Sequence, residues 1–403
     1  MKILVFADRL DVGGTQVNAI DLTEALRDLH GHEVVLFATP GPMVKLAHEK
    51  GLRFLPAPYS RIHPSPARMR ALREAVQSER PDVIHIWDWP QCLDAYYGVY
   101  LTMRVPMIVT VMTMDLPRLL PKALPTTLGT PQLLDQARKA GRGPLELILP
   151  PVDVNQNTPG AVDTSSFREQ YGIRPGDLTL VTVSRLVEWM KAESLRRTIE
   201  VVGTLGRDLP LRFLIVGDGT SRAHLDQLAR RVNSELGRQA VVLTGALLDP
   251  RPAYAAADIV IGMGSSALRG MAFAKPVIVV GERGFSAPFN SETSEGFYYT
   301  GFYGVGEGKP GNDRLATDVL AVVSQRERFG ELGQFSRDFV ITHFSVEAVG
   351  ARLERFCRKV AAEVPRLDLA LADGVRTAAV GLSRRLVPDV LRHRLRAHKR
   401  LAG

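Results

Sequence analysis

Short apolar runs alternate with stretches of helical periodicity along most of the chain. This pattern is typical of a parallel β-sheet with helices on both of its faces. Within residues 15–29, for example, Val17, Ile20 and Leu22 fall on the one apolar face that a helix presents. In the first half we predict strands at 2–7, 33–38, 53–57, 83–86, 107–112 and 145–149, and helices at 15–29, 43–50, 67–77 and 131–139.

The second half of the chain repeats the alternation. Strands are predicted at 178–183, 212–216, 240–243, 258–261 and 276–280, and helices at 193–206, 221–236, 253–257, 265–273, 316–329 and 346–362. Two doubly wound α/β domains in series are therefore expected, with the carboxyl ends of both sheets facing a shared cleft. A Pro- and Gly-containing stretch at 150–165 links them.

The domain boundaries follow from this pattern. We predict an N-terminal Rossmann-like domain at 1–155 and a second at 156–345. A helix at 346–365 should cross back towards the first domain, and a basic tail follows at 366–403. Two segments, 113–144 and 281–312, are predicted as irregular loops apart from the helix at 131–139, and such loops commonly carry specificity.

Composition places the chain among ordinary globular proteins. Its 403 residues are 45% hydrophobic and 23% charged, enough for two or three separate cores. The N-terminus lacks the pattern of a signal peptide, and no apolar run approaches the roughly 18 residues of a membrane span. Cys92 and Cys357 are the only cysteines, so neither a disulfide framework nor a zinc spacing is present. These features favour a cytoplasmic protein.

The positive charge is concentrated in the tail. The net charge is +8, and residues 366–403 carry nine Lys or Arg against three Asp. Arg384–Leu395 predicts a basic amphipathic helix, beginning near Pro388, that rests on an anionic membrane surface. A helix packed on the body, or a solvated tail, is the alternative. Nucleic acid is disfavoured as a partner because no aromatic residue or recognised binding motif accompanies the charge.

Two cations stand out on the loop after the strand at 178–183. Arg185 and Lys191 are six residues apart, between that strand and the following helix. Fixed cations at the carboxyl end of a parallel strand are suited to a diphosphate. A solvated loop with two surface charges is the alternative interpretation.

Other candidate positions are individually weaker. Gly13-Gly14 opens a helix after the first strand without forming the dinucleotide motif, and Gly217-Asp218-Gly219 follows a strand in the second half. Ser265 or Ser266, after Gly264, is predicted to cap a helix whose free N–H groups would form a second anion site. A tight turn or simple capping is the alternative interpretation for each of these. Asp115, after the strand at 107–112, is a candidate general base, ligand or loop cap.

Taken together, these segments resemble the family 4 retaining glycosyltransferases of the GT-B fold, over nearly the whole chain up to about Ala362. The matching stretches are Gly13-Gly14-Thr15, Pro-Asp-Val-Ile-His-Ile at 81–86, Ile-Leu-Pro-Pro-Val-Asp at 148–153, Val-Ser-Arg-Leu-Val at 183–187 with Lys191, Phe-Leu-Ile-Val-Gly-Asp-Gly at 213–219, Leu-Thr-Gly at 243–245, Ala-Ala-Asp-Ile-Val-Ile at 256–261 and Met-Ala-Phe-Ala-Lys-Pro-Val at 271–277.

The resemblance implies a set of donor-binding residues. Arg185 and Lys191 would bind the diphosphate of a UDP- or GDP-type sugar, with the Gly14-Thr15 turn contributing an amide to the same phosphates. Ser265 and Ser266, following Gly264, would offer amides to the distal phosphate, and the base would lie near Gly217 and Thr244. No metal or other cofactor is expected, so fixed cations and helix ends would stabilise the leaving diphosphate.

The sequence also departs from the family pattern. The paired glutamates of the E-x7-E motif would fall at Ile261 and Arg269, and a common histidine would fall at Met112. Arg269 cannot accept a hydrogen bond from ribose, because a guanidinium only donates. Glu188, Glu282 and Glu295 are the carboxylates considered as replacements.

The sequence therefore predicts a retaining glycosyltransferase, metal-independent and cytoplasmic or peripheral on the inner membrane face, that acts on an unidentified sugar, lipid-linked or small-metabolite acceptor. The main alternative is a catalytically degenerate relative that binds a nucleotide or a partner. Another GT-B enzyme, such as a nucleotide-sugar epimerase, is a third reading.

Overall fold

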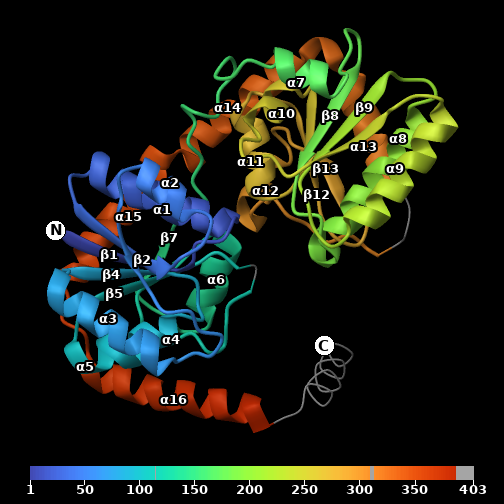
Figure 1. Ribbon diagram of the computed structural model, residues 1–403. Coiled ribbons are helices and arrows are strands. Elements are labelled where there is room, and N and C mark those ends of the chain that lie inside the picture. The colour runs from blue at the N-terminus through green and yellow to red at the C-terminus, as the bar shows by residue number, and fades with distance from the viewer. Residues whose placement is uncertain (114, 309–312, 387–403) are drawn as a thin grey trace. The chain divides into compact units, whose positions relative to one another are not determined.

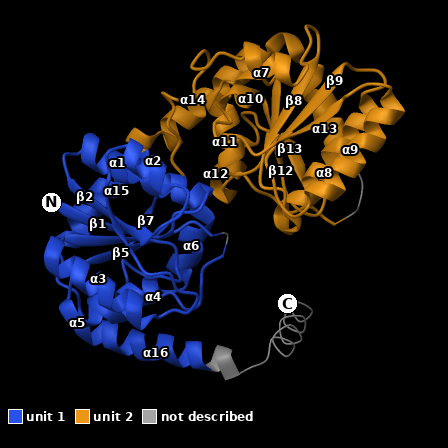
Figure 2. Ribbon diagram, viewed as in Figure 1, with its two compact units in different colours: residues 1–149, 349–403 blue, residues 150–348 orange. Residues whose placement is uncertain are grey.

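The computed structural model describes residues 1–113, 115–308 and 313–386, and divides them into two compact units (Figures 1 and 2). Unit 1 contains residues 1–149 together with the chain from Val349 onward, and unit 2 contains residues 150–348. Each unit is built on one sheet, and each is described by itself.

Unit 1 has a seven-stranded parallel sheet in the order β3-β2-β1-β4-β5-β6-β7. The strands are β1 (Lys2–Arg9), β2 (Glu33–Thr39), β3 (Arg53–Pro56), β4 (Val83–Trp87), β5 (Met107–Val111), β6 (Thr126–Leu128) and β7 (Leu145–Leu147). The helical segments are α1 (Gly14–Asp28), α2 (Val44–Glu49), α3 (Pro66–Glu79), α4 (Cys92–Ala95), η1 (Tyr96–Tyr100), α5 (Leu101–Met103) and α6 (Pro131–Lys139).

The centre of this sheet is apolar with one polar ladder through it. Leu4, Ile84 and Val109 are completely buried, as expected for parallel strands covered on both faces. His85 is buried among them, and its Nε2 lies 2.6 Å from Thr110 Oγ1, so it is a hydrogen-bonded core residue. The same hydroxyl lies 2.6 Å from Thr127 Oγ1.

Unit 2 has a six-stranded sheet in the order β10-β9-β8-β11-β12-β13, in which only the edge strand β13 runs antiparallel. The strands are β8 (Leu178–Val183), β9 (Leu211–Val216), β10 (Val241–Gly245), β11 (Ile259–Gly262), β12 (Val277–Val280) and β13 (Ser286–Pro288). The helical segments are α7 (Ser165–Gln170), η2 (Glu188–Ala192), α8 (Glu193–Leu205), α9 (Arg222–Leu236), α10 (Arg251–Ala256), α11 (Ser265–Ala272), α12 (Ser294–Thr300), α13 (Asp313–Val323), η3 (Arg326–Arg328) and α14 (Phe329–Phe344).

In each sheet the strand order reverses beside the first strand. The order turns from one direction to the other between β1 and β4 in unit 1, and between β8 and β11 in unit 2. The loops at the carboxyl ends of two such strands diverge to opposite faces and leave a crevice, which is where open α/β sheets bind ligands. The topology therefore singles out one edge of each unit.

Two loop predictions were incomplete. The segment 113–144 contains strand β6 besides the expected helix α6, and the segment 281–312 contains β13 and α12. Both strands are only three residues long, too short to show a period. The single helix predicted at 316–329 was also wrong, because α13 ends at Val323 and a separate helix, α14, begins at Phe329.

The C-terminal helices belong mainly to unit 1. Helix α15 (Val346–Ala361) lies against α1, where a side-chain carbon added to Gly350 would approach Ala25 Cβ to 3.4 Å. Helix α16 (Leu367–Leu386) follows. The basic helix predicted to begin near Pro388 lies outside the described residues, and α16, which precedes it, was not predicted.

Burial of His85 makes the stability of unit 1 sensitive to acid. Burial lowers the pKa of His85 to about 3, against about 6.5 in an unfolded chain. Neutral His85 therefore contributes to the free energy of unfolding above pH 6.5. This contribution, on the order of 4 kcal/mol, is lost as the pH falls towards 3. We predict that His85→Gln reduces the fall in the free energy of unfolding at acid pH, measured by circular dichroism. The same substitution at the exposed His224 should leave that fall unchanged. Equal acid limbs for His85→Gln and wild type would contradict this.

Candidate functional site

The loop after β8 carries two cations that lack a protein counter-charge. Arg185 is exposed and Lys191 is half-buried. Within the described ranges, neither side chain makes a hydrogen bond or an ion pair. Burial and, to a smaller extent, the charge of Arg185 together lower the pKa of Lys191 to about 8. Two cations held close together without a carboxylate form a site that lacks an anion.

The backbone between these cations is strained. Met190 has φ 65° and ψ −21°, in the left-handed region that non-glycine residues seldom adopt, and Trp189 before it departs from helical geometry. Such a conformation costs roughly 1–3 kcal/mol and is held by its surroundings. Immediately after it, Lys191 enters the turn that leads to α8.

Close backbone contact with the loop after β9 holds Arg185 in place. Ser184 N donates to Val216 O at 2.9 Å, and Leu186 N donates to Asp218 O at 2.9 Å. Gly217 has φ 144°, and a Cβ there would lie 1.8 Å from Ser184 O. The Gly-Asp-Gly turn is therefore required by packing, whatever its part in ligand binding.

Thr244, at the end of β10, adjoins the same turn. Gly217 N donates to Gly245 O at 2.9 Å, and Thr244 Oγ1 donates to Gly245 O at 2.9 Å. The loops after β8, β9 and β10 are thus hydrogen-bonded in series along one edge of unit 2. This brings Arg185, Gly217 and Thr244 onto neighbouring loops.

The amino end of α11 lies across the strand reversal from Arg185. The predicted serine cap is wrong: Gly264 is the N-cap residue, with φ 54°, and it makes no side-chain cap. Ser265 and Ser266 form the first turn instead. Ser266 Oγ is occupied by the hydroxyl of Tyr254, which donates to it at 3.2 Å, and Ser266 N donates to Met263 O at 3.3 Å. Ser265 N has no acceptor within the described chain and remains available for an anion.

Arg269 lies one turn further along α11. It is half-buried, its charge opposes the burial-induced rise in the pKa of Tyr254, and its guanidinium makes no hydrogen bond or ion pair in the part of the chain that the structure describes. With Arg185 and Lys191, it is a third such cation among the predicted site residues of unit 2.

Carboxylates do not replace the missing glutamates in an evident way. Ile261 is 1% exposed within β11. The Glu282 carboxylate accepts a hydrogen bond from Tyr303 Oη, and Glu188 accepts one from Ser221 Oγ at 3.3 Å. Glu295 is exposed in the first turn of α12. Of these, Glu188 lies on the same loop as Lys191.

The remaining predicted residues lie in unit 1. Gly13 is the N-cap of α1, and Gly14 and Thr15 form its first turn, which contains no acidic residue. Asp115 is exposed in the loop after β5, where Thr113 Oγ1 donates to its carbonyl at 2.8 Å. Met112, at the histidine position of the family, lies beside Gly129, where an added Cβ would approach Met112 Sδ to 2.9 Å.

A polar cavity that the sequence did not reveal lies at the strand reversal of unit 1. It is lined by Ala7, Asp8, Thr15, Gln16, Ala19, Trp87, Asp88, Pro90 and Gln91, and holds about 80 Å³. Thr15 lines it, whereas Gly14 and Asp115 do not. The volume is well below the roughly 300–1,000 Å³ of typical small-molecule sites, so the cavity can take only part of a ligand.

The cavity presents polar groups without protein partners. Gln91 is completely buried, and neither Oε1 nor Nε2 of its amide finds a partner in the described chain; the same holds for Trp87 Nε1. Burial raises the pKa of Asp88, and the nearby Asp8 carboxylate raises it further. Unpaired buried donors and acceptors beside carboxylates suit a ligand that both donates and accepts, such as a sugar hydroxyl.

Asp8 is held by an ion pair with a buried arginine, which also contacts a second aspartate. Arg68 is buried, with Nη1 3.1 Å from Asp8 Oδ1 and Nε 3.4 Å from Asp94 Oδ2. Asp94 in turn contacts His63 Nδ1 at 2.7 Å and accepts from Ser65 N at 2.6 Å. Single buried polar residues on separate elements carry no sequence pattern, which explains why they were missed.

Two further properties bear on the chemistry. Within residues 1–113, 115–308 and 313–386, no group of three or more His, Cys, Asp or Glu is placed to hold a metal ion. Over the same described residues, no helix has the length and apolarity needed to cross a membrane.

Comparison with protein families identifies both units. Residues 12–145 match the model of Glycosyltransferase Family 4, and residues 177–298 match that of Glycosyl transferases group 1. No curated protein sequence matches the chain.

Several solved structures share this fold. A glycosyltransferase from Rickettsia africae superposes with a TM-score of 0.71 at 15% identity, over 89% of this chain and 99% of that one. HepE from Anabaena in complex with UDP gives 0.69 at 16% identity, over 89% and 100%. Sucrose-phosphate synthase from Thermosynechococcus elongatus gives 0.68 at 15% identity, over 90% and 100%.

Two doubly wound units, shared with solved GT-B structures, confirm the predicted GT-B fold. Within that class, the chain belongs to the family 4, group 1, glycosyltransferases.

The close contact at Gly217 generates a prediction. Gly217→Ala should lower the free energy of unfolding by about 2 kcal/mol or more, because the methyl group meets Ser184 O and the backbone conformation disfavours alanine. Gly237 is a matched control, since its φ is also positive, at 63°, but no atom lies within 4 Å of an added Cβ. Gly237→Ala should cost about 1 kcal/mol. Equal losses in denaturant unfolding would contradict the packing argument.

Proposed function

We propose that this glycosyltransferase moves a sugar from a nucleoside diphosphate donor to a hydroxyl acceptor, with retention of configuration. Unit 2 would bind the diphosphate through Arg185, Lys191 and the first turn of α11. HepE, which has the same fold, has been solved in complex with UDP-glucose, which supports a donor of the UDP type; a GDP donor is the other candidate. Retention follows from the family resemblance.

One observation carries the donor assignment: among the residues that the structure describes, Arg185 and Lys191 have no counter-charge. A half-buried lysine with a lowered pKa beside an exposed arginine is unfavourable in the free protein. A diphosphate would remove that penalty, restore the full charge of Lys191 and accept from Ser265 N. The same contacts would strengthen as negative charge develops on the leaving group.

The acceptor hydroxyl would bind in the unit 1 cavity. Gln91 offers both a donor and an acceptor there, while Asp8 and Asp88 offer carboxylate oxygens. Because its pKa is raised, Asp88 is better suited than an ordinary aspartate to take a proton from a hydroxyl. This assigns Asp88 the general-base role first considered for Asp115. Sugar, lipid-linked and small-metabolite acceptors all carry the required group.

A nucleotide-binding protein without transferase activity is the second candidate, and the buried Ile261 together with Arg269 favours it. Incubation with UDP-glucose in the absence of acceptor separates the two functions. Slow hydrolysis with an α-configured product, detected by proton NMR, supports the retaining enzyme. Tight UDP binding with no hydrolysis and no transfer to any acceptor supports the binding protein.

Peripheral attachment to an anionic membrane through residues 366–403 is a separate proposal, because it rests on α16 and on neither sheet edge.

The donor assignment predicts a phosphate-specific loss of affinity. Arg185→Ala should weaken UDP binding by about 10- to 100-fold, as expected for hydrogen bonds to a charged group, and should leave uridine binding unchanged. Arg196→Ala is the matched control, since Arg196 lies on the exposed side of α8 beside Glu200. Calorimetric titration measures the binding of UDP and of uridine to the wild type and to both variants. An equal effect on UDP and uridine, or no UDP or GDP binding by the wild type, would overturn the assignment.

The acceptor assignment predicts that stability and activity change in opposite directions. Gln91→Leu removes a buried unpaired amide, so it should raise the free energy of unfolding by about 1–3 kcal/mol, while lowering kcat/KM for transfer at least tenfold with UDP affinity unchanged. Asn233→Leu is the contrasting control, since its amide is paired with Val241 at 2.9 and 2.8 Å and its loss should destabilise. A more stable Gln91→Leu protein with full transfer activity would refute the role.

A further inference from the structure

Helix α16 is docked on unit 1 by its small and polar side chains. Ala370, Gly374 and Thr377 lie on the buried side. Tyr96 Oη donates to Ala370 O at 2.6 Å, and Tyr97 Oη donates to Gly374 O at 2.8 Å. At Gly374 an added Cβ would lie 3.4 Å from Leu101 Cδ1, an ordinary van der Waals distance, so the helix packs directly on this part of unit 1.

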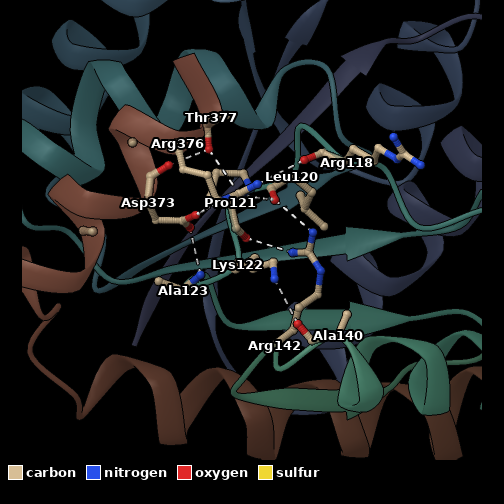
Figure 3. Close-up of polar contacts among 12 residues, drawn as sticks. Arg118, Leu120, Pro121, Lys122, Ala123, Ala140, Arg142, Asp373, Arg376 and Thr377 are labelled. Atoms are coloured by element: carbon tan, nitrogen blue, oxygen red, sulfur yellow. Dashed lines mark hydrogen bonds and ion pairs between the residues drawn. The ribbon is translucent and has the colours of Figure 1, made fainter. Parts of the chain in front are cut away.

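An aspartate on the same side of the helix fastens it to the loop before β6 (Figure 3). Asp373 Oδ2 accepts from Ala123 N at 3.0 Å, and Asp373 Oδ1 accepts from Arg376 Nε at 2.7 Å. Arg376 Nη2 donates to Leu120 O at 3.2 Å, and the same carbonyl accepts from Arg142 Nη2 at 2.9 Å. The docked face of α16 is therefore fixed by directional bonds and is not free to rotate outward.

The outward face of α16 is apolar. Leu371, Val375 and Leu382 are 51%, 72% and 61% exposed, and with Ala378 they form one stripe at helical spacing. Among the exposed positions of α16 whose side chains the structure describes, Asp368 is the only charged one, and it is paired with Arg366 at 2.9 Å. A surface helix ordinarily shows the opposite arrangement, with its apolar side packed and its polar side in water.

Apolar exposure is concentrated in this part of the chain. Of the sixteen large apolar side chains exposed in the described residues, five lie within residues 364–382, namely Val364, Leu369, Leu371, Val375 and Leu382. Isolated exposed apolar residues need no explanation, whereas a cluster marks an interaction surface.

The sequence that follows the stripe indicates the chemistry of its partner. After Leu382, residues 384–400 contain seven Lys or Arg and a single Asp. The helix ends at Leu386, so this basic segment begins within one turn of the last stripe residue. An apolar face continued by a strongly basic segment matches a bilayer surface, in which acyl chains lie beneath anionic headgroups.

We propose that the outward stripe of α16, Leu371–Val375–Ala378–Leu382, inserts into the surface of an anionic membrane, with the basic segment at 384–400 binding the lipid headgroups. Unit 1 is thereby held on the membrane by a helix whose other face is bonded to the protein. The surface differs from the basic helix first predicted near Pro388, because the apolar contact precedes the basic residues. A second copy of the chain is a poorer occupant, since it would bring two basic segments together.

Vesicle flotation of the full chain tests this surface. The wild-type protein should float with phosphatidylcholine–phosphatidylglycerol vesicles and not with pure phosphatidylcholine vesicles. Its binding to the anionic vesicles should weaken between about 0.1 M and 1 M salt, where the Debye length falls from roughly 10 Å to 3 Å. A triple variant, Leu371→Ser, Val375→Ser and Leu382→Ser, should lower partitioning at least about tenfold. Replacing the arginines at 384, 385, 392, 394 and 396 by glutamine should remove the preference for anionic lipid.

The matched control replaces exposed apolar residues elsewhere, Ile62→Ser, Leu248→Ser and Leu320→Ser, and should float like wild type. UDP binding, measured on every preparation, reports folding and the donor site separately, so the membrane surface and the proposed function can fail independently. Unchanged flotation of the α16 triple variant would overturn the proposal. A second outcome would also overturn it: the wild type does not bind vesicles but forms a concentration-dependent dimer, measured by light scattering, and the triple variant does not form that dimer.

Discussion

The donor site proposed for unit 2 depends on the contact between the loops after β8 and β9. Two backbone hydrogen bonds and the missing side chain of Gly217 bring Ser184–Leu186 directly onto the Gly-Asp-Gly turn. Leu186 is buried by this contact, so Arg185 beside it is left exposed at the sheet edge. The chain then passes through the strained Met190 to Lys191. One packing constraint thus positions two cations that have no counter-charge among the described residues. Electrostatic stabilisation of a transition state is most effective when such charges are already in place before the reaction.

The same principle links the other unusual regions of the molecule. Within the described chain, Gln91 and Trp87 have buried polar atoms without partners. Asp88 has a φ of 70°, and α16 exposes its apolar side. Each departs from what local physical rules favour, and such departures concentrate where a protein meets its ligands. Elsewhere the described core is regular: its parallel strands are apolar, and the buried His85 is hydrogen-bonded to Thr110.

Sequence reasoning recovered what periodicity and short-range pattern encode. Buried parallel strands are continuous apolar runs, so both sheets, and helix α6 at 131–139, were predictable. The three-residue strands β6 and β13 carry too little pattern, and Gly264 displaced Ser265 as the cap because only its left-handed backbone turns the chain into α11. The cavity lined by Asp8, Asp88 and Gln91 brings together residues from separate strands and loops. No local sequence pattern predicts that these residues lie close to one another.

We infer that Lys191 is a destabilised cation in the free protein and that it binds a diphosphate. Its protonation can be observed directly. Proton–carbon NMR of labelled lysine side chains, with the signal assigned through Lys191→Arg, follows its titration in the free protein and with UDP. The account predicts a pKa near 8 in the free protein, rising clearly when UDP binds and unchanged by uridine. An ordinary lysine pKa near 10.4, or a lowered one that UDP does not move, would contradict it.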